Sequence, residues 1–406
     1  MILFRYSFRN LLRRKIRTGI IATSVFTACA VLVFFRGLAD GGYRQLKDIS
    51  TRLRAGQVMV SANSWEKKQI PINILKDSSK IRSLIKERLP DCTVSERIFA
   101  AGTYRSEKGL FKAGALVGID FQQEEGKYGP EKFIVSGKID GRGIVLFESG
   151  AKKAALNPGD SVVIFIEDWI QKSIIRTTVS AVISDSYASN PSMVLIPLVR
   201  MRRAMNITDG ANFIAVSNPG YSDEKLLSRV KSVISSRDVS VFKWSIIMPT
   251  VEQFIAYHNA SVWIFQIFIF IIITITISNT MHMSVMERIR EISILKAVGA
   301  GTSFIRRQII LESLILSFLG SLVGAIAGIL ANWYFSVHGL DPSVFTGGQP
   351  LEIAGGAFNH RIHASVEILT PLISIVGMSL LGVVASLYAV YRATNFPITQ
   401  GIQKRG

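Results

Sequence analysis

Four long apolar segments constrain this chain more than any other feature of its sequence. They run from Thr18 to Phe35, Ala260 to Val285, Ser313 to Val337 and Ile368 to Tyr391, and none contains a charged residue. A helix needs about 20 apolar residues to cross the roughly 30 Å hydrocarbon core of a bilayer. We therefore predict four transmembrane helices. A cleaved signal peptide is the alternative for the first segment, but no small-residue cleavage site follows that segment.

The distribution of basic residues predicts the orientation of these helices. The chain carries 47 Lys and Arg against 29 Asp and Glu. The excess lies before the first segment, between the second and third, and after the fourth, whereas the loop between the third and fourth is acidic. Because cytoplasmic loops are enriched in Lys and Arg, we expect both termini to be cytoplasmic. Membrane topology thus accounts for the positive charge, and no nucleic-acid partner is predicted.

The predicted fold class is an α+β membrane protein with a large extracytoplasmic domain between its first two spans. The segments are a cytoplasmic amphipathic helix (1–17), a first span (18–36), the extracytoplasmic domain (37–259), a second span (260–285), a cytoplasmic helix (286–307), a third span (308–337), an extracytoplasmic loop (338–367), a fourth span (368–391) and a cytoplasmic tail (392–406). The N-terminal helix is predicted because Phe4, Phe8, Leu11 and Leu12 share one face and Arg5, Arg9 and Arg13 another; a disordered basic tail is the alternative.

The extracytoplasmic domain contains two similar strand-helix-strand patterns. The first pairs an alternating strand at Gly56 to Ala62 with a helix at Asp77 to Leu89 and a strand beginning at Cys92. The second has a strand at Ala211 to Ser217, a helix capped by Ser222 or Asp223, and a final strand. The residues between them, about 105–206, are rich in strands and turns. We expect an α/β subdomain interrupted by a β-rich one.

The sequence contains no recognisable catalytic or metal-binding motif. It has no GxxxxGK[ST] stretch to hold nucleotide phosphates, no HExxH and no CxxC. Cys29 lies in the first span and Cys92 outside the membrane, so no intrachain disulfide is predicted. His258 and His282 have no partner at ligand spacing. The chain is therefore predicted not to be an enzyme and to hold no cofactor or metal. Glu312, near the start of the third span, is a candidate functional group because ionisable residues at that depth are costly.

A short charged stretch, Val285 to Gly301, lies between the second and third spans. Ile289, Ile292 and Leu295 recur at helical spacing, and the glycine at 299 follows them as a helix stop. A solvated loop helix would gain nothing from these apolar residues, whereas an amphipathic helix can dock into a groove on a cytoplasmic partner. The predicted contact residues are Glu287, Arg288, Arg290, Glu291, Ile292, Leu295, Lys296 and Gly299.

This stretch and the span after it resemble a known family. "VMERIREISILKAVGAGTSFIRRQIILESLILSFLGSLVGAIAG" is similar to the coupling segment and third span of ABC transporter permeases of the MacB/FtsX/lipoprotein-releasing type. The four-span order resembles that family's layout over essentially the whole chain. "GIVLFESGAKKAALNPGDSVVIF" resembles a segment of the LolC/LolE-like permeases in particular. The turn that corresponds to their carrier-recruiting hook, Glu167 to Ser173, is short here, which argues against carrier recruitment by a hook.

The resemblance implies a function and a set of partners. These are a cytoplasmic ABC ATPase dimer that binds ATP and Mg, a second permease subunit that is identical or paralogous, membrane lipid, a lipoprotein substrate and a periplasmic carrier. ATP-driven movement of the coupling helices would change the shape of the external domains, and the substrate need not cross the membrane. Lipoprotein extraction from a bacterial inner membrane is the first expectation. A MacB-like efflux permease and an FtsX-like regulator of a cell-wall hydrolase are the alternatives.

A lipid path between the first two spans is a further expectation. If substrate lipid enters there, some large apolar residues of these spans should face a lateral cleft. The candidates are Phe26, Phe34, Phe35, Phe265, Phe268 and Phe270.

Overall fold

The computed structural model describes residues 15–63, 74–124, 129–167, 172–188, 190–234, 238–347, 351–353, 356–358 and 361–397. It contains two compact units. The first, the helical unit, comprises Met1–Tyr43, Ala256–Leu340 and Arg361–Gly406. The second, the sheet unit, comprises Arg44–Ile255 and Asp341–His360.

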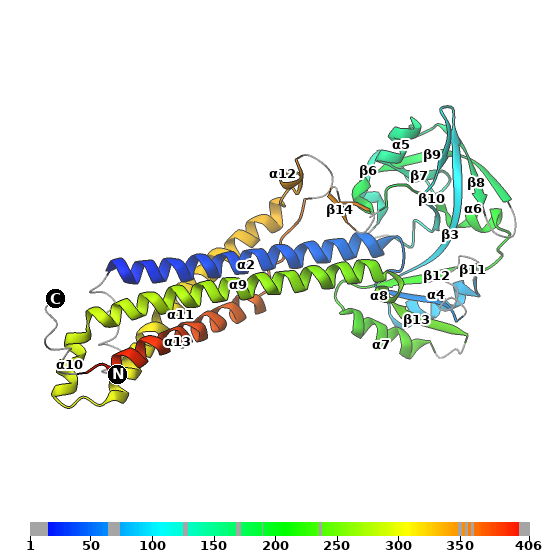
Figure 1. Ribbon diagram of the computed structural model, residues 1–406. Helices are drawn as coiled ribbons and strands as arrows, with labels where there is room; N and C mark the ends of the chain where they lie inside the picture. The colour runs from blue at the N-terminus through cyan, green and yellow to red at the C-terminus, as the bar shows by residue number, and fades with distance from the viewer. Residues whose placement is uncertain are drawn as a thin grey trace. The chain divides into compact units, whose positions relative to one another are not determined.

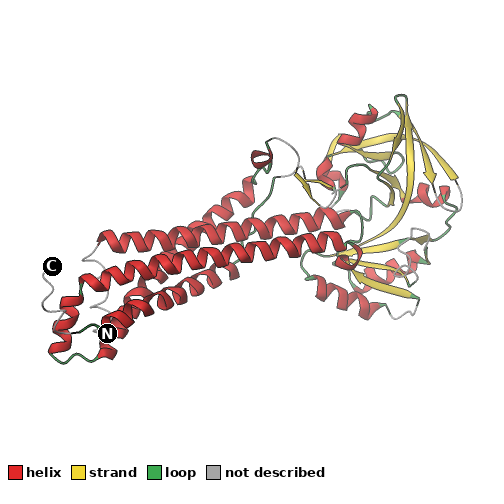
Figure 2. Ribbon diagram, viewed as in Figure 1, coloured by secondary structure: helices red, strands yellow, loops and turns green. Residues whose placement is uncertain are grey.

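The helical unit is built on four long apolar helices that run alongside one another (Figures 1 and 2). The helices are α2 (Lys15–Arg52), α9 (Pro249–Glu287), α11 (Thr302–His338) and α13 (Leu369–Asn395), with the short α10 (Ile289–Ala297) between α9 and α11. All four are long and apolar enough to cross a membrane, so the predicted multi-pass membrane protein is confirmed. Helices α2 and α9 are longer than the uncharged segments. Helix α2 continues to Arg52, and α9 begins at Pro249.

Small residues let α11 approach α2 closely. Gly320, Gly324 and Gly328 lie one turn apart on α11, and a side chain at each would meet the backbone or side chains of residues 22–33 of α2. Beyond them, the Asn332 side-chain nitrogen donates to the Val33 carbonyl oxygen at 2.9 Å. In lipid there is no hydrophobic driving force for helices to associate. Close backbone approach allows the van der Waals contacts and hydrogen bonds that stabilise their association instead.

Small residues also let α11 and α13 pack closely. The Ser313 hydroxyl donates to the Gly382 carbonyl oxygen at 2.6 Å. A side chain added at Gly382 would overlap Ser317, which is fully buried. The helices of this unit thus meet through serine and glycine, while Ile277, Leu316 and other apolar side chains fill the core beside them.

The sheet unit contains an 11-stranded mixed sheet flanked by short helices. Its strands are β1 (Val58–Ala62), β3 (Thr93–Ser106), β4 (Gly109–Lys112), β5 (Ala115–Ile119), β6 (Ile134–Gly137), β7 (Ile144–Phe147), β8 (Ser161–Glu167), β9 (Lys172–Ile183), β10 (Met193–Pro197), β12 (Phe213–Ser217) and β13 (Val239–Lys243). Two small pairs stand apart, β2 (Leu75–Lys76) with β11 (Gly210–Ala211) and β14 (Leu351–Ile353) with β15 (Gly356–Phe358). The short helices are α4 (Ser78–Arg88), α5 (Glu148–Ala154), α6 (Leu198–Ala204), α7 (Asp223–Val233), α8 (Trp244–Ile247) and α12 (Ser343–Thr346), with 3₁₀ turns η1 (Pro130–Phe133) and η2 (Asp185–Tyr187).

One end of the sheet is formed by the two strand-helix-strand units predicted from the sequence. The strand order β13-β1-β12-β3 is antiparallel throughout, and α4 and α7 pack on it around Ile85, Leu226 and Val230. This is a split β-α-β arrangement. Ser222 caps α7 by accepting from the Lys225 backbone N–H at 3.4 Å. Strand β1 was expected to alternate, but its first four residues are all buried, because both faces of the strand are covered.

Strand β3 joins this end of the sheet to the remainder. Its first residues pair with β12 and β5, and its last residues pair with β8 and β4. The β-rich insert predicted at about 105–206 continues the same sheet, because the 14-residue strand β3 crosses position 105 without interruption.

Several predicted segments fall outside the described residues. The amphipathic helix at 1–17 does so except for its last three residues, and so do 168–171, the centre of the short turn, and 398–406 in the tail. The hairpin that carries the turn is described up to Glu167, which pairs with Lys172.

The packing of α11 on α2 gives a prediction for stability. Replacing Gly324 by Ala places a methyl group against the Phe26 carbonyl oxygen, and we expect a loss of about 1–3 kcal/mol in stability from overpacking. Gly19→Ala is the matched control, because a side chain there meets nothing within 4 Å and alanine favours a helix by about 0.5–1 kcal/mol. Thermal unfolding of the purified chain in detergent measures both; equal melting temperatures for the two variants would contradict the proposed close contact.

Candidate functional site

The charged stretch between α9 and α11 forms a helix shorter than predicted. Helix α9 ends at Glu287, α10 begins after a break at Arg288, and α10 ends at Ala297. Gly299 follows with a φ of 98°, a left-handed conformation that suits glycine. The Ala300 N–H bonds to the Leu295 carbonyl oxygen at 2.9 Å, and the Gly299 N–H to that of Lys296 at 3.1 Å. These bonds form a Schellman stop, which confirms the predicted helix end.

A buried ion pair fixes the beginning of α10 to α11. The Arg288 guanidinium donates to both carboxylate oxygens of Glu312, at 3.1 and 2.9 Å, and the Gln308 side chain donates to the same carboxylate at 3.1 Å. The two charged side chains are 11% and 5% exposed. Buried charges are tolerated only when paired and hydrogen-bonded. The structure thus assigns Glu312 a partner that the sequence analysis did not name.

Lys296 fixes the other end of α10 to α13. Its ammonium donates to the Thr394 carbonyl oxygen at 2.6 Å and to that of Phe396 at 3.4 Å. These carbonyls belong to the end of α13, where a helix leaves acceptors without internal partners and favours a cation. Burial lowers the pKa of Lys296 from its ordinary value. Both ends of α10 are therefore tied to the membrane helices by hydrogen-bonded cations.

The apolar face of α10 corrects one prediction. Ile292 was expected to project into a partner's groove, but it is 7% exposed and packs in the core of the helical unit with Ile289. Leu295 is half-buried. The exposed apolar residues are instead Ile294 and Val298, at 47% and 83%. The prediction was wrong because the sequence shows that α10 has an apolar face but not what covers that face. The chain's own helices cover the face of Ile289 and Ile292.

The charged residues of the stretch also fall into an exposed group and an inward-facing group. Glu287, Arg290 and Glu291 are exposed, whereas Arg288 and Lys296 point inward. Glu291 remains 58% exposed although one of its oxygens lies 3.7 Å from the Arg288 guanidinium. The outer surface of this stretch is thus a mixed patch of Glu287, Arg290, Glu291, Ile294 and Val298, hereafter the outer face of α10.

An apolar groove of about 780 Å³ lies between α2 and α9. It is lined by Ile16, Gly19, Ile20, Thr23, Ser24, Thr27, Ala28, Val31, Ile269, Ile272, Ile273 and Thr276. None of these described lining residues is one of the six phenylalanines predicted for a lipid path. The groove lies between the two helices where that path was expected, but β-branched and small residues line it.

The six phenylalanines have several different surroundings. Phe34 packs on Phe335 of α11 with ring centroids 5.5 Å apart, and Phe35 on Phe265 of α9 at 5.8 Å. Phe270 packs against the core of the helical unit, and Phe26 is half-buried. Phe268 is 60% exposed. Phe35, Phe265 and Phe268 are exposed enough to contact a lipid.

The remaining polar residues do not assemble a catalytic or metal site in the part of the chain that the structure describes. No group of three or more His, Cys, Asp or Glu side chains there is placed to hold a metal ion. His282 packs on the Tyr388 ring at 5.1 Å. Both cysteines are buried, and neither forms a disulfide.

Comparison with known proteins relates this chain to permeases. A family model described as FtsX-like permease C-terminal matches residues 263–398. The uncharacterized ABC transporter permease MJ1507 of Methanocaldococcus jannaschii is 34% identical over 124 residues, which is 29% of this chain and 31% of that protein. The macrolide export ATP-binding/permease protein MacB of Bordetella avium is 31% identical over 94 residues, 23% of this chain and 14% of that protein.

Part of the chain is also similar to a solved structure. The periplasmic region of MacB from Actinobacillus actinomycetemcomitans has a TM-score of 0.35 and 17% identity, and covers 51% of this chain and 95% of that chain. The segments matched in the two curated relatives span about a third or less of those proteins.

The buried ion pair gives a second prediction. Glu312→Ala leaves Arg288 buried without its main partner, and breaking a buried pair in this way costs about 3–5 kcal/mol. Glu291→Ala removes the same type of side chain from the exposed end of the same cluster, where an ion pair contributes about 0–1 kcal/mol. Thermal unfolding in detergent should therefore show a large drop for the first variant and almost none for the second; similar melting temperatures would show that the pair does not hold α10.

Proposed function

We propose that this chain, which is similar to FtsX-like and MacB permeases of ABC transporters, couples ATP hydrolysis by a separate cytoplasmic ATPase to movement of its own membrane helices and external domain. ATP and Mg would be bound by that partner and not by this chain. The proposal places the protein in the inner membrane of a bacterium with both termini in the cytoplasm. A second permease subunit, identical or paralogous, would complete the assembly.

The attachment of α10 at both ends carries this proposal. A helix can transmit a displacement only if it is held firmly at the point where it is pushed and at the points where it pushes. Arg288 ties α10 to α11, and Lys296 ties it to the end of α13. The outer face of α10 remains exposed for a docking groove, with an apolar centre and charged margins.

The substrate we propose is a lipoprotein taken from the membrane. The groove between α2 and α9 supports this choice, because acyl chains need an apolar surface that is open to the bilayer. The resemblance of residues 143–165 to lipoprotein-releasing permeases supports it as well. A periplasmic carrier would accept the released lipoprotein.

Efflux is the second candidate, because two similar proteins are described as macrolide export proteins. An FtsX-like transmitter that controls a cell-wall hydrolase is the third. Reconstitution of the chain with its ATPase distinguishes the three. ATP-dependent release of a labelled lipoprotein to a soluble acceptor supports the first, macrolide-stimulated ATPase activity supports the second, and hydrolase activation without release supports the third.

The outer face of α10 gives a third prediction. Ile294→Asp introduces a charge into the proposed apolar contact, and burying an isoleucine side chain contributes about 1.5–3 kcal/mol. We expect co-purification of the ATPase to weaken by roughly one to two orders of magnitude. Glu291→Lys, which reverses a charge at the margin, should also weaken it.

Val199→Asp is the matched control for Ile294→Asp. Val199 is 67% exposed on α6 in the sheet unit, so the variant adds the same charge at an exposed apolar position. ATPase recovery should equal that of the unmodified chain. If Ile294→Asp also recovers the ATPase fully, the outer face of α10 is not the docking surface.

The groove gives a fourth prediction. A photoreactive amino acid at Ile272, which lines the groove, should crosslink to a lipoprotein in membranes containing the assembled transporter. Leu380 is the control, because it is 61% exposed on α13 but does not line the groove. Crosslinks of equal yield at both positions would indicate general lipid exposure and remove the groove from the path.

A further inference from the structure

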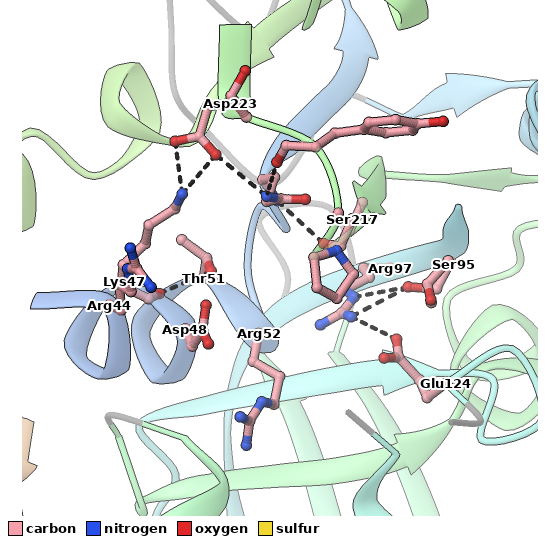
Figure 3. A pocket seen from close by; sticks show the side chains of 17 residues that line it. Arg44, Lys47, Asp48, Thr51, Arg52, Ser95, Arg97, Glu124, Ser217 and Asp223 are labelled. Atoms are coloured by element: carbon pink, nitrogen blue, oxygen red, sulfur yellow. Dashed lines mark hydrogen bonds and ion pairs between the residues drawn. The ribbon is translucent and has the colours of Figure 1, made fainter. Parts of the chain in front are cut away.

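A second cavity lies within the sheet unit, and the coupling function does not use it. Its volume is about 640 Å³. The last turns of α2 form one wall, strands β3 and β12 form another, and the beginning of α7 closes it (Figure 3). A volume of this size is typical of small-molecule sites, which span about 300–1,000 Å³.

Arg97 is the main feature of this cavity. It projects from β3 and is 2% exposed. Its Nε and Nη2 donate to the Ser95 hydroxyl at 3.3 and 3.2 Å, and Nη2 also donates to Glu124 at 2.5 Å. The buried Nη1 has no hydrogen-bond partner among the described residues. In Figure 3 it points away from Ser95 and Glu124, toward the side of the cavity where Asp48 and Arg52 lie.

Buried guanidinium donors are rarely left unpaired, because desolvation without a compensating hydrogen bond is costly. Arg97 is held in place by two partners on one side, which fixes the direction of the unpaired nitrogen. The cavity therefore presents an oriented cationic donor to whatever occupies it.

The other charged residues that line the cavity include more cations than anions on the wall formed by α2. Lys47 is neutralised by Asp223, whose carboxylate accepts from it at 2.6 and 2.7 Å and from the Trp244 indole at 2.7 Å. Arg44 and Arg52 bring two further guanidinium groups to the same wall. Arg52 is fixed by donating to the Tyr187 carbonyl oxygen at 3.1 Å and by lying over the Phe133 and Tyr187 rings. Asp48 is the remaining lining carboxylate, and it stands across from Arg97.

We propose that this cavity binds a phosphate ester. The planar fork of arginine matches phosphate oxygens, and arginine residues from α2 and β3 line the same cavity. A doubly charged phosphate suits more than one guanidinium better than a single carboxylate does. Asp48 can accept from a hydroxyl or ammonium group on the ester, which favours a headgroup such as phosphoethanolamine over bare phosphate. The same chemistry is found in a free phosphoester and in a phospholipid headgroup.

Calorimetric titration of the full chain in detergent tests this proposal. The probes are inorganic phosphate, O-phosphoethanolamine, short-chain dihexanoylphosphatidylethanolamine and acetate. We expect saturable binding of O-phosphoethanolamine that is tighter than that of phosphate, with acetate weakest. Competition by the short-chain lipid identifies a lipid headgroup as the ligand, and its failure to compete identifies a soluble phosphoester. Absence of saturable phosphoester binding in the unmodified chain, or acetate binding as tightly as the phosphoester, overturns the proposal.

Matched variants on one strand locate the site. Arg97→Lys keeps the charge that pairs with Glu124 but removes the Nη1 donor, and should weaken phosphoethanolamine binding by about tenfold or more. Arg105→Lys makes the same change at an exposed position of β3 and should bind as the unmodified chain does. Arg44→Gln changes an exposed lining residue and should weaken binding several-fold without affecting folding. Full binding in both Arg97→Lys and Arg44→Gln would overturn the assignment even if Arg97→Lys lowers the melting temperature.

Discussion

The ion pair between Arg288 and Glu312 fixes the beginning of the short helix α10 against the long apolar helix α11. A carboxylate near the beginning of an apolar helix cannot stay charged and dry without a cation beside it. Arg288 supplies that cation from the break between α9 and α10, and Gln308 occupies a further acceptor site on the same carboxylate. The contact holds the break at Arg288, and with it the beginning of α10, against α11. Lys296 then completes the attachment at the end of α13.

Packing among the long helices follows a different principle. Lipid is as apolar as leucine, so leucine-rich contacts alone give the helices little reason to associate. Glycine and serine allow the backbones of α2, α11 and α13 to come close enough for dispersion contacts and hydrogen bonds. Helix α9 is the least buried of the four, since only 11% of its most apolar 18-residue stretch is buried by the rest of the protein. Helix α9, which borders the groove together with α2, is thus the most exposed of the four helices.

Much of this architecture could be predicted from the sequence, because it depends on local patterns. Four uncharged segments gave four membrane helices, and Gly299 gave the end of α10. What could not be predicted depends on contacts between distant residues. Lys296 and Thr394 are separated by 98 positions, and the helical phase of α10 could not show which side its own helices would cover. The Arg97 cavity went unnoticed for the same reason, since residues from α2, β3 and α7 meet only after folding.

The length of β3 has a consequence for how the sheet unit loses its structure. This strand gives its first half to the split β-α-β end and its second half to the β8–β9 hairpin, so neither part has a complete set of backbone partners without it. Amide protons on both sides should then share one opening free energy, as residues of a single cooperative unit do. A domain of this kind responds to force as one body. It would move or unfold as a whole, with no independent half to open first.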